Sequence, residues 1–103
     1  MIKVAITGVA GRMGKTLVQA LQAADGMILG AAFEHPDNPA VGLDVGEVAG
    51  VGTLGVTVSG DPAGCVQDFD VVVDFTVPAA TLALLEVCQN HQKAMVIGTT
   101  GFS

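Results

Sequence analysis

A glycine-rich turn close to the N-terminus limits what this chain can fold into more than any other feature. Residues 2–7, Ile-Lys-Val-Ala-Ile-Thr, are predicted to form a buried strand, and glycines follow at positions 8, 11 and 14. A helical spacing of apolar residues then runs from 12 to 24. Glycines let a ligand approach the backbone, and the N-terminus of a helix points N–H groups and a positive dipole at an anion. The pattern therefore predicts a turn that binds a phosphate group.

The three glycines have separate predicted roles. Gly8 makes the tight turn, Gly11 lets a pyrophosphate come close, and Gly14 lets the helix pack on the sheet. Their spacing, G-x-x-G-x-x-G, has one more residue between the first two glycines than the usual dinucleotide-binding pattern G-x-G-x-x-G. The turn alone therefore does not identify the ligand.

An acidic residue supports a dinucleotide as the ligand. The second apolar run, 27–33, is predicted to be a strand and is followed by Glu34. Glu34 lies about 20 residues beyond Gly14, the distance at which a ribose-binding carboxylate follows in such sites. The alternative is an ordinary tight turn between a strand and a helix, with Glu34 solvated.

Residues 14–16, Gly-Lys-Thr, also match the end of the phosphate-binding loop of nucleoside triphosphatases, G-x-x-x-x-G-K-[ST]. That loop requires a glycine five residues before Gly14, where this chain has Val9, and Gly8 lies one position too early. Binding of a nucleoside triphosphate is therefore the less favoured alternative. Lys15 is interpreted as a helix residue on the solvent side.

The composition fits one α/β domain. With 103 residues, of which 50% are hydrophobic and 14% charged, the chain suits a single sheet buried on both faces. The net charge of −6 disfavours nucleic acid and anionic membranes as partners. No apolar run reaches the roughly 18 residues of a membrane helix, and the N-terminus lacks the features of a signal peptide. We therefore expect a cytoplasmic protein.

The cysteines and histidines do not suggest a metal site. Cys65 and Cys88 lie in helical patterns without a C-x-x-C motif, so both are predicted to be buried free thiols. His35 and His91 are far apart in the sequence. The absence of tryptophan and tyrosine also disfavours a surface for stacking single-stranded nucleic acid.

The segment from His35 to Leu54 is predicted to be a long loop, because it has no clear periodicity and contains several glycines and prolines. Loops of this length in compact domains are often functional. Asp44 and Glu47 lie in its middle, and an acid–base pair is one interpretation of them. A solvated loop is the favoured one, since neither carboxylate has a recognisable partner.

Strands and helices alternate over the rest of the chain. The predicted elements are a strand at 56–58, a short helix with Asp61 as N-cap and Pro62 as its first residue that ends near Asp68, a strand at 70–76, a helix from Pro78 to about His91, and a strand at 94–97. In the longer helix, Leu82, Leu85 and Cys88 recur every three residues and are predicted to share one side. The alternation predicts an α/β fold with a doubly wound parallel sheet, a Rossmann-like dinucleotide-binding domain over residues 1–103.

Ligands of such sheets bind outside the carboxyl ends of the strands. Residues 8–14, 74–76 and 98–101 all follow or end predicted strands, so we expect them to converge there. Their threonines, Thr76, Thr99 and Thr100, can then donate hydrogen bonds to a ligand. The alternative is that these hydroxyl groups only satisfy their own loops.

Several motifs together resemble one family, the 4-hydroxy-tetrahydrodipicolinate reductases, also called dihydrodipicolinate reductases. The similarity is to the N-terminal domain of that family and covers essentially the whole chain. The motifs that carry it are Gly-Val-Ala-Gly-Arg-Met-Gly at 8–14, Phe-Glu at 33–34, the Asp-Phe-Thr ending of 70–76, and Val-Ile-Gly-Thr-Thr-Gly-Phe at 96–102.

The resemblance implies a cofactor, NADH or NADPH, and hydride transfer to a cyclic dicarboxylate in the diaminopimelate route to lysine. It also implies roles for named positions: Gly8, Val9, Ala10, Gly11, Arg12 and Met13 would surround the pyrophosphate, Glu34 would hold the adenosine ribose, and Gly98, Thr99 and Thr100 would lie near the nicotinamide and its ribose, with Phe75 and Thr76 beside them. Arg12 would also be placed to meet a 2′-phosphate.

His35 is a departure, because several members of the family have an arginine after the ribose-binding acid. Histidine is only partly charged near neutral pH, and Glu34 repels a 2′-phosphate. The sequence therefore favours NADH, or use of both cofactors.

The catalytic residues of the family lie in a separate substrate domain, which would follow Ser103. We therefore expect residues 1–103 to bind cofactor without catalysing the reaction alone, and the complete enzyme to be a homo-oligomer whose contacts lie largely in the other domain. The strand at 94–97 would then leave an apolar edge open to pairing.

Two other functions stay open from the sequence. One is the first domain of another NAD(P)-dependent dehydrogenase, for instance one that acts on aspartate or a semialdehyde. The other is a non-catalytic sensor that binds a dinucleotide and reports its redox state.

Overall fold

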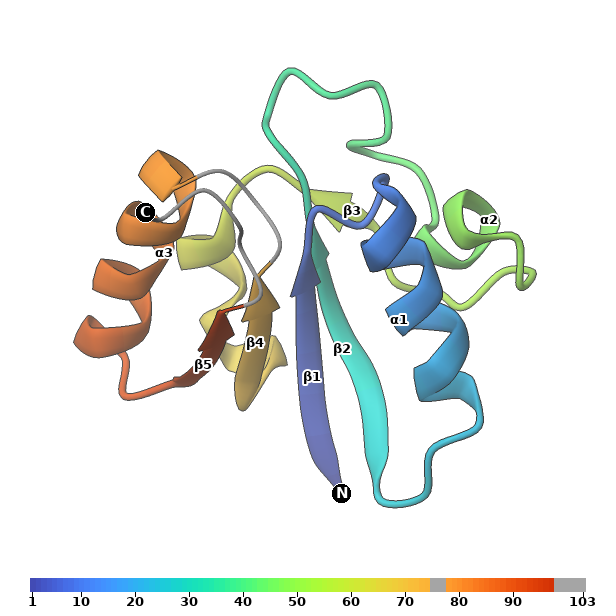
Figure 1. Cartoon of the computed structure of the whole chain (residues 1–103), viewed down its shortest axis with the longest axis horizontal. Helices are drawn as coiled ribbons and strands as arrows, with labels where there is room; N and C mark the ends of the chain where they lie inside the picture. Colours follow the sequence, from blue (N-terminus) through green and yellow to red (C-terminus); the bar gives the residue numbers. More distant parts are fainter. Residues whose placement is uncertain (75–77, 98–103) are drawn as a thin grey trace.

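The computed structural model describes residues 1–74 and 78–97 and shows a five-stranded parallel sheet of order β3-β2-β1-β4-β5 (Figure 1). The elements in chain order are β1 (Ile2–Thr7), α1 (Arg12–Gln22), β2 (Met27–Phe33), α2 (Val45–Ala49), β3 (Val58–Ser59), the 3-10 helix η1 (Pro62–Asp68), β4 (Val71–Asp74), α3 (Pro78–Asn90) and β5 (Ala94–Ile97). The chain crosses from β2 and β3 on one side of β1 to β4 and β5 on the other, as the predicted doubly wound sheet requires.

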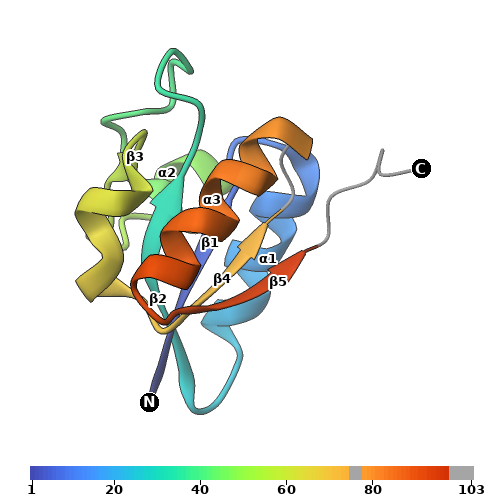
Figure 2. The same cartoon turned by 90° about the vertical axis from the view of Figure 1, so that its left-hand side faces the viewer.

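The two faces of the sheet are covered by different helices. Helices α1 and α2 pack on one face, and η1 and α3 pack on the other (Figures 1 and 2). Successive residues of β1 point to opposite faces, so Val4 and Ile6 lie in the core under α1 while Ala5 lies in the core under α3. In that second core, the rings of Phe33 and Phe69 pack edge to face, with 5.8 Å between their centroids. Burial on both faces explains the high apolar content of the strands.

Most predicted elements are confirmed, and the middle of the chain differs most. The predicted loop 35–54 contains α2, which begins after Asp44 and ends before Gly50. The side chain of Asp44 accepts N–H groups of Gly46 and Glu47, and Gly50 takes the left-handed conformation at φ 79°. The prediction that Asp44 has no partner is therefore wrong, because its carboxylate caps a helix.

The third strand is displaced from its predicted position. It pairs with β2 through Val58 and Ser59 rather than over 56–58. Thr57 instead forms an isolated antiparallel bridge with Asp44, which ties the start of α2 to the residues before β3.

The buried face of α3 also differs from the prediction. Leu82 is 60% exposed, whereas Thr81, Leu84 and Cys88 are buried. The helix is apolar on several sides, so spacing by three could not identify the buried one. Cys65 is only partly buried, which corrects its prediction as a buried thiol, and Cys88 is buried as predicted.

In the described part of the chain, no helix has the length and apolar character needed to span a membrane. Within the same residues, His, Cys, Asp and Glu side chains form no group of three or more that could hold a metal ion.

Candidate functional site

The turn after β1 has the tight geometry that its glycines predicted. Gly8 has φ 71°, a conformation that side chains rarely adopt. Its N–H donates to the carbonyl of Phe33 at 2.9 Å, and its own carbonyl accepts the N–H of Gly11 at 3.0 Å. The turn is thus closed on itself and anchored to the end of β2.

Gly14 allows the close contact between α1 and this turn. A Cβ atom on Gly14 would lie 2.3 Å from the carbonyl oxygen of Gly8 and 2.6 Å from the Cα of Val9, both backbone atoms. On Gly11, a Cβ would lie 3.3 Å from the same oxygen. Gly14 therefore cannot carry a side chain without displacing the turn, whereas a Cβ on Gly11 requires only a small shift.

The N-terminus of α1 is open to an anion. The N-cap residue is Gly11, so no side chain at that position caps the helix, and the first turn of α1 contains no acidic residue. The first N–H groups of a helix have no partner within it, and here they follow the glycine turn directly. Arg12, the first residue of α1, is exposed beside them. This end of the helix thus combines a positive dipole with a basic side chain.

Glu34 connects the end of β2 to the turn. One carboxylate oxygen accepts the N–H of Ala10 at 2.9 Å, and the other accepts the N–H of His35 at 3.2 Å. Each carboxylate oxygen has two lone pairs, so Glu34 keeps the capacity to accept ribose hydroxyl groups as well. Glu34 therefore lies directly beside the glycine turn, and its role as a ribose-binding residue stays a prediction.

His35 lies on the outer rim of this region. Its side chain is 72% exposed, and its Nδ1 accepts the N–H of Asp37 at 3.2 Å. Asp37, 93% exposed, places a second carboxylate 3.8 Å from the same nitrogen. The rim next to Glu34 is therefore acidic rather than basic.

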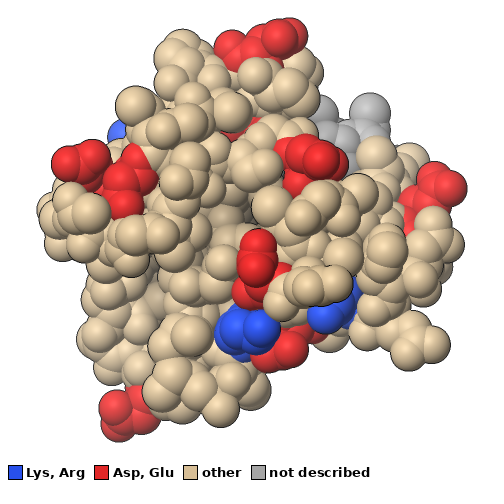
Figure 3. Space-filling view, turned by 180° about the vertical axis from the view of Figure 1, so that it is seen from behind, with Lys and Arg blue, Asp and Glu red and all other residues tan. Residues whose placement is uncertain are grey.

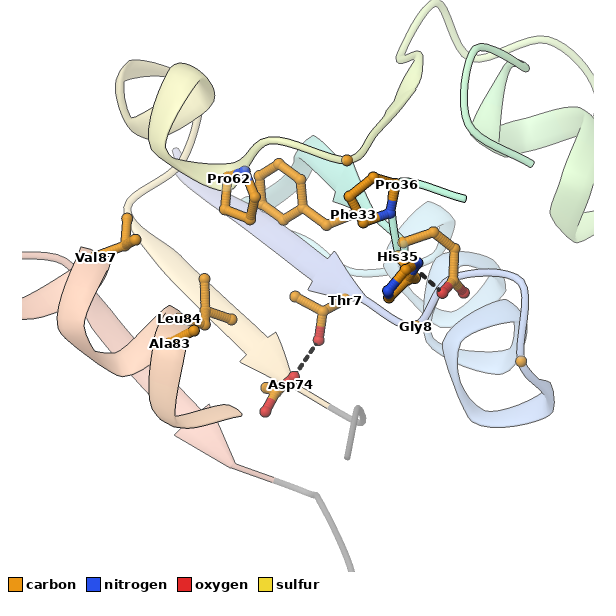
Figure 4. A pocket seen from close by; sticks show the side chains of 13 residues that line it. Thr7, Gly8, Phe33, His35, Pro36, Pro62, Asp74, Ala83, Leu84 and Val87 are labelled. Carbon is orange, nitrogen blue, oxygen red and sulfur yellow. Dashed lines mark hydrogen bonds between the residues drawn. The ribbon is translucent and has the colours of Figure 1, made fainter. Parts of the chain in front are cut away.

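A cavity of about 590 Å³ joins these groups along the carboxyl ends of β1, β2 and β4 (Figure 4). Thr7, Gly8 and Gly11, at and after the end of β1, are among its lining residues. The remaining lining residues are Phe33, Glu34, His35, Pro36, Gly60, Pro62, Asp74, Ala83, Leu84 and Val87. Most of the wall is apolar, and polar groups are concentrated at the strand ends, as in sites that hold a ring system by its polar parts.

Asp74, at the end of β4, contributes a buried carboxylate to the wall of this cavity. Its two oxygens accept the hydroxyl groups of Thr7 from β1 and Thr81 from α3. Figure 4 shows Thr7 and Asp74 pointing toward each other. Burial, and secondarily the charge of Asp74, raise the pKa of the Cys88 thiol. The sequence placed Asp74 at a strand end but gave it no role.

The structure brings together one half of the predicted site. The residues from Gly8 to Met13, with Glu34 and His35, lie in or beside the glycine turn after β1. Within that set, the side chain of Val9 is fully buried, so only its backbone faces the site, and Met13 is 55% exposed. The other predicted residues, Phe75, Thr76, Gly98, Thr99 and Thr100, lie outside the described residues.

The surface charge does not by itself attract an anion. On the face seen from behind, acidic side chains are spread widely, and most of the visible basic atoms lie together in its lower half (Figure 3). With a net charge of −6, the attraction for a phosphate must come from the local dipole and N–H groups of α1.

The described residues fit a dinucleotide. Gly8 and Gly11 line the cavity next to the N-terminus of α1, where a pyrophosphate could reach it, and Glu34 provides acceptors for a ribose. The cavity then continues past β1 to β4, which gives room for a second nucleoside.

Comparison with known proteins agrees with this geometry. Residues 2–103 match the family model described as dihydrodipicolinate reductase, N-terminus. The chain is 52% identical over 101 residues to the 4-hydroxy-tetrahydrodipicolinate reductase of Saccharophagus degradans. That alignment covers 98% of this chain and 38% of the relative, so the chain spans well under half of its length.

Solved structures of oxidoreductases share the fold. An amine dehydrogenase from Mycobacterium smegmatis superimposes with a TM-score of 0.79 at 28% identity, covering 93% of this chain and 29% of that one. An oxidoreductase from Agrobacterium radiobacter, solved with NAD+, L-tartaric acid and magnesium, gives 0.67 at 25% identity, covering 91% and 26%. The fold, the glycine turn and the family match together show that this chain belongs to the dihydrodipicolinate reductase family and corresponds to its N-terminal domain.

Proposed function

We propose that this chain is the NAD(P)H-binding domain of a 4-hydroxy-tetrahydrodipicolinate reductase of lysine biosynthesis. The proposal rests on one observation: the uncapped N-terminus of α1, at Gly11, and the Glu34 carboxylate line the same cavity. The first suits a pyrophosphate and the second suits the adenosine ribose. When bound, the cofactor supplies a hydride for reduction of the substrate.

The residues of this chain bind and orient the cofactor in this proposal. The N–H groups at the start of α1 receive the pyrophosphate, Glu34 accepts the ribose hydroxyl groups, and Arg12 lies where it can neutralise phosphate charge. We place Phe75, Thr76, Gly98, Thr99 and Thr100 near the nicotinamide half, on the basis of the family resemblance.

The activity of the whole enzyme extends the proposal beyond this chain. We propose that the catalytic residues, the contacts to a cyclic dicarboxylate substrate and the main contacts of a homo-oligomer belong to the part of the relatives that this chain does not cover. A biosynthetic role of this kind supports a cytoplasmic location. By this reasoning residues 1–103 bind the cofactor and do not turn over substrate alone.

We also propose that NADH is preferred, or that both cofactors are used. Glu34 repels a 2′-phosphate, and the side chain that follows it is His35, with Asp37 at 3.8 Å from its Nδ1. An acidic rim of this kind lowers the affinity for NADPH relative to NADH. NADPH that binds more than about tenfold tighter than NADH, a difference of about 1.4 kcal/mol, would contradict this preference.

Parallel calorimetric titrations of the chain with NADH, NADPH and ATP–Mg test the function. We expect both reduced dinucleotides to bind and ATP–Mg not to bind, because the turn has Val9 where a triphosphate-binding loop needs glycine. A folded chain, verified by circular dichroism, that binds none of the three would refute the proposed site. Binding of ATP–Mg alone would favour the triphosphatase alternative.

A further inference from the structure

The strand order determines where each half of a dinucleotide would lie. Glu34 follows β2, the glycine turn follows β1, and Asp74 ends β4, and these three strands are neighbours in that order. All three groups line one cavity. With the adenosine ribose at Glu34 and the pyrophosphate over β1, the nicotinamide half extends over β4. Asp74 is therefore on the nicotinamide side of the pyrophosphate.

Asp74 is held as a hydrogen-bond acceptor in a buried environment. Its exposed fraction is 0%, and its two oxygens receive hydroxyl hydrogen bonds from Thr7 and Thr81. Burial disfavours the charged form of a carboxylate and donated hydrogen bonds favour it, and both oxygens of Asp74 receive such a bond. Burial first, and the charge of Asp74 second, raise the pKa of the nearby Cys88 thiol.

The two redox forms of the cofactor differ in charge at the ring. Oxidised nicotinamide is a cation, and reduced nicotinamide is neutral, whereas the adenosine and pyrophosphate parts are the same in both. A buried negative charge near the ring distinguishes the two forms, because electrostatic interactions are strong where water is excluded.

We infer that Asp74 is a specificity-determining residue that favours the oxidised, cationic nicotinamide over the reduced, neutral one. The inference rests on the proposed function, since it requires a dinucleotide with its adenosine half at Glu34. In a reductase such a group is favourable, because positive charge develops on the ring as the hydride leaves, and a fixed anion stabilises that change.

The test measures the dissociation constants of NAD+, NADH and ADP-ribose for three proteins: the natural chain, Asp74→Asn and Thr81→Val. The asparagine variant removes the charge and keeps the shape. The valine variant is the matched control, because it removes one of the two hydrogen bonds to Asp74 and leaves the carboxyl group itself in place. ADP-ribose lacks the nicotinamide and reports on the adenosine half alone.

We expect Asp74→Asn to lower the affinity for NAD+ relative to that for NADH by about fivefold or more. The affinity for ADP-ribose should change by less than about threefold. We expect Thr81→Val to change the dissociation constants of NAD+ and NADH by the same factor. A purely structural role of Asp74 would instead weaken both forms equally, and an unchanged ratio in Asp74→Asn overturns the inference while leaving the proposed function intact.

The natural chain gives a second test that does not depend on how the variants fold. We expect it to bind NAD+ at least as tightly as NADH, because the buried anion offsets the cost of desolvating the cationic ring. If NADH binds at least tenfold tighter than NAD+, the inference is overturned and the proposed function is not affected. If neither form binds to the folded chain, the proposed function fails and the inference with it.

Discussion

The Cβ atom that Gly14 lacks would lie 2.3 Å from the carbonyl oxygen of Gly8, although the two residues belong to different elements. Gly14 is in the first turn of α1, and Gly8 begins the turn after β1 with φ 71°. This contact determines how closely the helix N-terminus approaches the end of the strand. The stability of the domain and the shape of the glycine turn therefore depend on the same pair of glycines.

Gly14→Ala is expected to lower the free energy of unfolding by at least about 2 kcal/mol, because backbone atoms on both sides of the contact must move. Gly11→Ala is the matched control. Its φ of −79° suits alanine and its Cβ contact is 3.3 Å, so we expect a loss of no more than about 1 kcal/mol. Urea denaturation followed by circular dichroism measures both variants. Equal destabilisation of the two would contradict the role given to Gly14.

The same control variant separates stability from binding. Gly11 lines the cavity next to the N-terminus of α1, so we expect a methyl group there to obstruct the pyrophosphate proposed to bind beside it. We expect Gly11→Ala to remain folded and to bind NADH at least tenfold more weakly than the natural chain, measured by calorimetry. Unchanged affinity would mean that the pyrophosphate does not approach this turn.

Glu34→Gln is expected to lower the affinity for NADH about tenfold, because a neutral amide replaces the charged carboxylate that accepts hydrogen bonds from the ribose hydroxyl groups. The same change removes repulsion of a 2′-phosphate, so the affinity for NADPH relative to NADH rises. Parallel titrations with both cofactors give the ratio. Glu47→Gln, a change at an exposed carboxylate on α2, is the matched control and should leave both affinities unchanged.

The sequence predicted the elements that a strong local pattern specifies. The first strand, the glycine turn and the strand 27–33 were correct because apolar runs and glycine spacing are local signals. Helix α2 was missed because five residues are too few for a periodicity, although Asp44 and Glu47 at positions of a capping box, with Gly50 at the other end, mark both of its ends.

The face of α3 and the role of Asp74 could not be read from local patterns. Thr81 is buried because its hydroxyl group bonds to Asp74, a contact between a helix and a strand that depends on the assembled fold. Likewise, the link from Thr7 to Asp74 spans β1 and β4. Such polar contacts across elements have no sequence period, so only the three-dimensional arrangement shows them.

Asp44 makes the domain sensitive to acid. Hydrogen bonds from backbone N–H groups, that of Leu54 foremost, hold the pKa of this carboxyl below its ordinary value of 3.8. A group with a lowered folded pKa contributes stability above its unfolded pKa and loses that contribution as the pH falls through the folded value. We therefore expect part of the stability to disappear below about pH 4.

The variant Asp44→Ala tests this assignment. It removes the N-cap of α2 and the acceptor for the N–H groups of Leu54 and Gly55, so we expect a lower melting temperature at pH 7. The difference from the natural chain should shrink as the pH falls below 4. Asp25→Asn, at an exposed turn, is the control. A difference that is independent of pH would show that the carboxylate charge is not responsible.

The two cysteines are expected to differ strongly in reactivity. Cys88 is 1% exposed, and burial together with the charge of Asp74 raises the pKa of its thiol, whereas Cys65 is partly exposed in η1. Since the thiolate is the reacting form, Cys88 reacts only when the domain opens. We expect a chromogenic disulfide reagent at pH 8 to label Cys65 at least about 100-fold faster than Cys88. Cys65→Ser should abolish the fast phase, and full denaturation should expose Cys88. Two fast phases in the natural chain would show that the core between α3 and the sheet opens readily, and the buried environment assigned to Asp74 would then be wrong as well.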